Sequence, residues 1–101
     1  MTSVEEESST SLPPTAVWEH VSKLSILEDK PIMLDYWTDS LEKKVLIGVK
    51  KEGGEKLLVK NAEEYTSPIS KIYKTNDCYI ICTENSIYLT SCNIPTKHIN
   101  N

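Results

Sequence analysis

The chain has 101 residues, which is enough for one domain, and its net charge of −4 is unevenly distributed. Residues 1–29 carry six acids and one lysine, whereas residues 30–101 carry nine acids and ten lysines and no arginine. The nearly neutral second part argues against nucleic-acid binding, because that binding depends on a concentration of positive charge. No apolar run approaches the ~20 residues that span a bilayer, so no membrane partner is expected.

The first segment, residues 1–14, reads MTSVEEESSTSLPP and is predicted to be a disordered acidic tail. Its apolar surface is too small to offset the entropy lost on ordering. No apolar signal region is present, which favours an intracellular location, cytoplasmic or nuclear, with free thiols.

Residues 15–29 are predicted to form a short amphipathic helix. Val17, Val21 and Leu24 are spaced by four and three residues, as on one face of a helix. Thr15 is the expected N-cap. The apolar stripe either covers a β-sheet core or docks into a partner, and we favour the first interpretation.

Residues 30–92 are rich in strand patterns. Pro31–Trp37 and Val45–Lys50 alternate, and the polar residues between them form a connection. Gly53-Gly54 then predicts a tight turn into a strand over Lys56–Asn61, because glycine accepts positive φ without steric cost.

The next three strands are predicted over Pro68–Thr75, Cys78–Thr83 and Ser86–Ser91. A β-bulge near Ser70-Lys71 reconciles the spacing in the first of them, which begins at Pro68 or lies at an edge. A two-residue turn at Glu84-Asn85 sets the register of the last two strands. It places Cys78 opposite Ser91, Tyr79 opposite Thr90, Ile80 opposite Leu89, Ile81 opposite Tyr88 and Cys82 opposite Ile87.

These elements predict an all-β fold, in which a small antiparallel meander closes into an SH3-like barrel of five or six strands. An OB-like barrel is the alternative. The short helix precedes the barrel, and residues 93–101 are predicted to be a flexible C-terminal tail.

No metal site, cofactor or catalytic residue is predicted. Cys78, Cys82, Cys92 and His98 invite a zinc interpretation. On a strand, however, residues four apart lie ~13 Å from each other, too far for one tetrahedral ion. No catalytic motif is present in the sequence, so we do not expect an enzyme.

The Cys78–Ser91 hairpin is apolar on both faces, and a small barrel buries only one. We therefore expect Tyr79, Ile81 and Tyr88, together with Trp18, to bind a protein partner or a second copy of the chain. The expected function is that of a non-enzymatic protein-binding module: an assembly subunit, an adaptor or a regulatory factor.

The alternative function is a weak reader of nucleic acid or of a modified peptide. Tyr36, Trp37, Tyr65 and Tyr73 would then gather at one end of the barrel. Clustered aromatic rings can enclose a methylated lysine or stack on bases.

Overall fold

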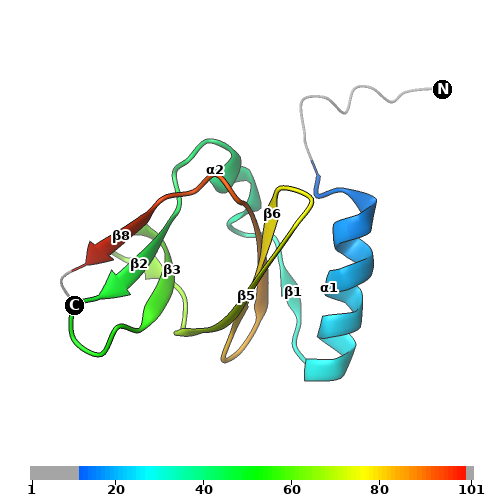
Figure 1. Cartoon of the computed structure of the whole chain (residues 1–101), viewed down its shortest axis with the longest axis horizontal. Helices are drawn as coiled ribbons and strands as arrows, with labels where there is room; N and C mark the ends of the chain where they lie inside the picture. The colour runs from blue at the N-terminus through cyan, green and yellow to red at the C-terminus, as the bar shows by residue number, and fades with distance from the viewer. Residues whose placement is uncertain (1–11, 100–101) are drawn as a thin grey trace.

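The computed structural model describes residues 12–99, which form three layers (Figure 1). Helix α1 packs on one side of a first sheet, and a second sheet packs on the other. The helices are α1 (Thr15–Glu28) and α2 (Trp37–Leu41). The strands are β1 (Ile32–Met33), β2 (Leu46–Lys50), β3 (Lys56–Asn61), β4 (Glu64–Tyr65), β5 (Ile69–Thr75), β6 (Cys78–Thr83), β7 (Ile87–Ser91) and β8 (Thr96–Ile99).

The prediction of a single antiparallel barrel is wrong. The strands form two separate four-stranded sheets, with order β1-β7-β6-β5 in the first sheet and β4-β3-β2-β8 in the second. Both sheets are mixed, because β1 pairs with β7 and β8 pairs with β2 in parallel. Parallel partners are distant in sequence and leave no turn signal, so a meander was the simpler but incorrect interpretation.

The β6–β7 hairpin has the predicted register. All five expected pairs are present, from Cys78 opposite Ser91 to Cys82 opposite Ile87. The Thr83 hydroxyl accepts hydrogen bonds from the N–H groups of Asn85 and Ser86 and thereby holds the turn. Because side chains alternate along a strand, this register fixes which residues face each side of the first sheet.

Strand β5 also follows the prediction closely. It begins after Pro68, forms the outer edge of the first sheet, and shifts register between Ile69 and Lys71. The turn into β6 is made by Asn76 and Asp77, whose φ angles are 50° and 62°. Asparagine and aspartate tolerate this left-handed region better than most residues.

The predicted helix is present as α1, but the prediction that Thr15 is its N-cap is wrong. Thr15 is the first helical residue, and Pro14 occupies the N-cap position without a side-chain hydrogen bond. At the other end, Asp29 adopts left-handed φ and ψ, and its N–H donates to the carbonyl of Ser25. Val17 and Val21 are completely buried, as their spacing predicted.

The predicted strand over Pro31–Trp37 is mostly wrong. Only Ile32–Met33 pairs as a strand, and the chain then turns into α2. The hydroxyl of Ser40 on α2 donates to the carbonyl of Trp37 (2.6 Å) and accepts from the N–H of Ser91 (2.9 Å). These buried hydrogen bonds hold α2 against β7, a long-range contact that local alternation could not indicate.

The second sheet contains the predicted β2–β3 hairpin. Gly53 and Gly54 have φ angles of 87° and 71°, as the turn requires. The sheet also contains a strand within the predicted C-terminal tail, because Thr96–Ile99 pairs with β2. Gly48 permits this pairing, since a Cβ there would lie 2.9 Å from Cδ1 of Ile99.

Two apolar cores lie on opposite sides of the first sheet. The helix-side core joins α1 to the first sheet and contains Val17, Val21, Trp37, Cys78, Ile80, Cys82, Ile87 and Leu89. The inter-sheet core joins the two sheets and contains Tyr36, Val45, Ile47, Leu58, Ile81 and Ile94. The first sheet is thus covered on both faces by the chain itself.

Replacing Ile81 tests this arrangement. Ile81 is completely buried in the inter-sheet core, so Ile81→Ala should lower the free energy of unfolding by about 2–5 kcal/mol. Ile26→Ala is the matched control, because Ile26 is 80% exposed and should change the stability by less than about 0.5 kcal/mol. Urea unfolding followed by circular dichroism measures both. Equal stability of the two variants would contradict the two-sheet packing.

Candidate protein-binding groove

Three of the four residues predicted to bind a partner lie between the two sheets. Ile81 is completely buried, and Tyr79 and Tyr88 are half-buried against the inter-sheet core. Trp18 is half-buried as well, against the helix-side core on the other side of the first sheet. The predicted face is therefore occupied by the second sheet in the folded chain.

The four aromatic residues of the alternative site are not brought together. Tyr36 and Trp37 are neighbours in sequence, but they enter opposite cores, with exposures of 8% and 5%. Tyr65 lies on β4 at the edge of the second sheet, and Tyr73 lies on β5 at the edge of the first. These positions do not form an aromatic cage.

Tyr36 packs against Tyr88 and Lys60 rather than against the other aromatic residues of the predicted site. Its ring meets that of Tyr88 edge to face with centroids 5.4 Å apart, and the Nζ of Lys60 lies 4.7 Å from its centroid. Burial raises the pKa of Tyr36 to about 12, with nearby Tyr88, Glu64 and Asp35 acting in the same direction. The phenol therefore stays neutral to a higher pH than an exposed tyrosine does.

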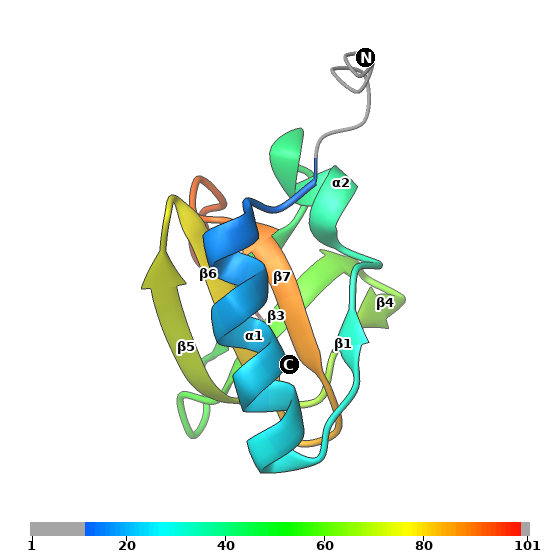
Figure 2. The ribbon, with the colours of Figure 1, turned by 90° about the vertical axis from the view of Figure 1, so that its right-hand side faces the viewer.

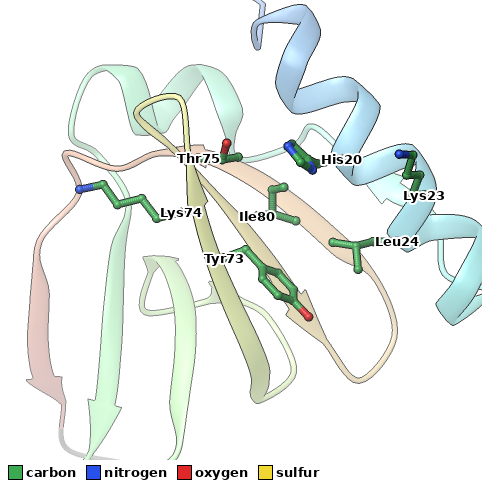
Figure 3. Close-up of a pocket in the computed structure, with 7 residues that line it drawn as sticks. All are labelled: His20, Lys23, Leu24, Tyr73, Lys74, Thr75 and Ile80. Carbon is green, nitrogen blue, oxygen red and sulfur yellow. The ribbon is translucent and has the colours of Figure 1, made fainter.

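An open groove lies between α1 and the edge strand β5. It has a volume of about 430 Å³, and Figure 3 shows the residues that line it. They are His20, Lys23 and Leu24 from α1, Tyr73, Lys74 and Thr75 from β5, and Ile80 from β6. Tyr73 is the most exposed apolar side chain of β5, at 39%.

The strand register explains this composition. Tyr73 pairs with Ile80, and Thr75 pairs with Cys78, so Tyr73 and Thr75 share the face of the first sheet that α1 covers. The helix packs over β6 and β7, and β5 lies beside it rather than under it (Figure 2). The α1-facing side of β5 is consequently left open.

The groove is lined by basic groups and by no carboxylate. Within residues 12–99, the structure gives His20, Lys23 and Lys74 no ion pair or side-chain hydrogen bond. Figure 3 shows the Lys74 side chain on the opposite side of β5 from α1. Positive charge therefore flanks the β5 edge on both faces.

An ion pair outside the groove joins α1 to β5. The Nζ of Lys71 on β5 lies 3.8 Å from a carboxylate oxygen of Glu28, at the end of α1. Because His20 and Thr75 line the groove nearer the start of α1, the helix and β5 run in opposite directions.

A second hollow borders β5 on the face that looks toward the second sheet. It is lined by Gly54, Glu55 and Lys56 from the β2–β3 turn and by residues 69–72 of β5. β5 is the outer strand of the first sheet, with the α1–β5 groove beside residues 73–75 and the second hollow beside residues 69–72. The unpaired N–H and C=O groups of such an edge are a template for an added strand.

Cys78 and Cys82 are buried thiols that their surroundings do not activate. Burial raises the pKa of the Cys78 thiol, with nearby Cys92 and Asp77 acting in the same direction, and burial also raises that of Cys82. Neutral thiols are poor nucleophiles and poor metal ligands. Among residues 12–99, no group of His, Cys, Asp and Glu side chains is placed to hold a metal ion.

Comparison with known proteins found no matching family model, and no significant match among curated proteins or solved structures. The functional interpretation therefore depends on the groove itself. The sequence predicted that strand β5 begins at Pro68 or lies at an edge, but it did not connect this strand to α1. The missing step was the placement of the helix over β6 and β7, which requires tertiary contacts.

Thiol labelling tests the burial of the cysteines. Cys78 and Cys82 are 3% and 1% exposed, whereas Cys92 is partly exposed. A water-soluble disulfide reagent at neutral pH should label one thiol rapidly and the other two at the rate of unfolding. Cys92→Ser should remove the rapid phase. Two rapid phases in the unmodified protein would contradict the structure.

Alkaline unfolding tests the environment of Tyr36. The unfolded chain releases this proton near pH 10 and the folded chain near pH 12, so stability should be retained below pH 10 and decline from pH 10 to 12. The tyrosine contributes at most ~1.4 kcal/mol per pH unit. Tyr36→Phe should lose less stability over this range, measured by urea unfolding. Tyr65→Phe, at an exposed position, should behave like the unmodified chain.

Proposed function

We propose that the chain is a non-catalytic protein-binding module that binds an extended, acidic segment of a partner protein along β5. The segment would add to the first sheet as a further strand, with some of its side chains in the groove beside α1. The observation that carries this proposal is the seven-residue edge strand, which pairs with no strand within residues 12–99 on its outer side and which borders a groove.

The chemistry of the groove favours an acidic partner with some apolar side chains. Lys23 and His20 border the α1 side, and Lys74 lies on the opposite face. Successive side chains of an added strand alternate between these faces, so acidic residues on both would meet a lysine. Leu24, Tyr73 and Ile80 provide an apolar surface for a β-branched side chain between them.

A second copy of the chain is a poorer occupant. Pairing two β5 edges would bring Lys71 and Lys74 of both copies to one seam, and like charges on adjacent strands are destabilising. Lysines at a sheet edge discourage such self-pairing. The same lysines attract a partner strand of opposite charge.

A catalytic role has less support from this groove. Its seven lining residues include no carboxylate and no thiol, and His20 has no side-chain partner within residues 12–99 that would orient it. General acid–base catalysis requires such positioned groups. The alternative aromatic reader lacks support, because its four aromatic residues are dispersed over two cores and two sheet edges.

Binding of a probe peptide tests the proposal. The probe is Thr-Val-Glu-Glu-Glu-Val-Thr with blocked ends, titrated into the ¹⁵N-labelled full chain. Saturable shifts should appear for the amides of β5 and for His20 and Lys23, and they should weaken as salt is added. A probe with methylated backbone nitrogens keeps its side chains but loses its donors, so it should not bind.

Charge reversal provides the matched control. Lys23→Glu with Lys74→Glu should weaken binding of the probe about tenfold, equivalent to ~1.4 kcal/mol. Lys51→Glu with Lys97→Glu changes the net charge equally at exposed positions outside the groove and should leave binding unchanged. If both double variants lost the same affinity for the probe, binding would depend on net charge alone, and this result would contradict a defined site. Absence of any binding would overturn the proposal.

A further inference from the structure

The groove between α1 and β5 is lined by Lys23, Lys74 and His20, and the sequence that precedes α1 carries the complementary charge. We infer that residues 4–9 of this same chain, Val-Glu-Glu-Glu-Ser-Ser, bind along β5 and compete with the partner segment. This inference rests on the proposed function, because it assigns a regulatory ligand to the same groove.

The first argument is charge. Residues 1–11 contain Glu5, Glu6 and Glu7 and no basic residue. In an extended strand Glu5 and Glu7 project to one face and Glu6 to the other. Lys23 and His20 lie on the α1 side of β5, and the Lys74 side chain lies on the other side of that strand. Two carboxylates facing α1 and one facing Lys74 therefore match the distribution of basic groups.

The second argument is reach. His20 lies five residues into α1 from Thr15, which is ~8 Å along the helix axis at ~1.5 Å per residue. The structure places Leu12, Pro13 and Pro14 before α1, with Pro13 buried, so residues 8–11 form the connection between Glu7 and Leu12. These four residues span up to ~13 Å when extended at ~3.3 Å each. The connection is therefore short, and it keeps the three glutamates near the start of α1, at the Thr75 end of the groove.

The third argument is direction. Helix α1 runs opposite to β5, so a segment that leads up to the start of α1 would run parallel to β5. The first sheet already accepts a parallel strand at its other edge, where β1 pairs with β7. Pro13 and Pro14 lack N–H donors, so pairing with β5 would end before them and the prolines would form the connection to α1.

The expected strength follows from tethering. A short connection gives the segment an effective concentration on the order of 1 mM at the groove. If the segment alone binds with a Kd near 0.1–1 mM, it lowers the apparent affinity of a competing partner by about 2- to 10-fold. Competition of this size is measurable and reversible, as regulation of a binding module requires.

The experiment compares two full-length variants of equal charge. Glu5→Gln, Glu6→Gln and Glu7→Gln together should increase the affinity for the Thr-Val-Glu-Glu-Glu-Val-Thr probe about 2- to 10-fold. They should also shift the amides of β5 and His20 before any probe is added. Glu42→Gln, Glu52→Gln and Glu63→Gln change three exposed glutamates that do not line the hollows beside β5 and should have neither effect.

A peptide of residues 1–11, added to the Glu5/Glu6/Glu7 variant, should shift the same amides, and its glutamine version should not. Equal affinity of the probe for the unmodified chain and for that variant would overturn the inference and leave the proposed function intact. Failure of the probe to bind either protein would overturn the proposed function, and the inference with it.

Discussion

The structure depends on covering a strand that is apolar on both faces. Cys78, Ile80 and Cys82 of β6 project to one side of the first sheet, and Tyr79 and Ile81 project to the other. Exposing either face to water would cost on the order of 1.5–3 kcal/mol for each large apolar side chain. The chain meets this requirement with two different covers, α1 on one side and a second sheet on the other.

The second sheet covers more of the first sheet than α1 does, and the groove lies where α1 leaves the first sheet uncovered. The second sheet contacts β5 through Ile69 and Ile72, which pack against the inter-sheet core. A single helix is ~10 Å across and covers about two strands at their ~4.8 Å spacing. Because α1 is centred over β6 and β7, Tyr73 and Thr75 on β5 stay partly open to solvent. The candidate site is thus the part of the sheet that the helix cannot cover.

Sequence reasoning predicted the local parts of this fold well. The β6–β7 register, the β5 bulge, the Gly53-Gly54 turn and the start of α1 each follow from a few adjacent residues. It failed where partners are distant in sequence. Neither the pairing of β8 with β2 nor the turn of Tyr36 and Trp37 into opposite cores has a local signal. The sequence showed that the β6–β7 hairpin is apolar on both faces. The prediction was that another molecule covers the second face, whereas the second sheet of the same chain covers it.

The positive charges of Lys71 and Lys74 on β5 repel a second copy of the strand and attract an acidic strand. An edge strand without charge would pair with any exposed edge, including that of another copy. Lys71 and Lys74 make pairing between copies repulsive, and Glu28 pairs with Lys71 and Lys30 but not with Lys74. Lys74 and Lys23 have no ion pair within residues 12–99, and in the proposed function they would select a strand of opposite charge. Specificity is a difference between affinities, so repulsion of the wrong strand is as effective as attraction of the right one. The charges that keep the edge from aggregating are therefore the same charges that would define its ligand.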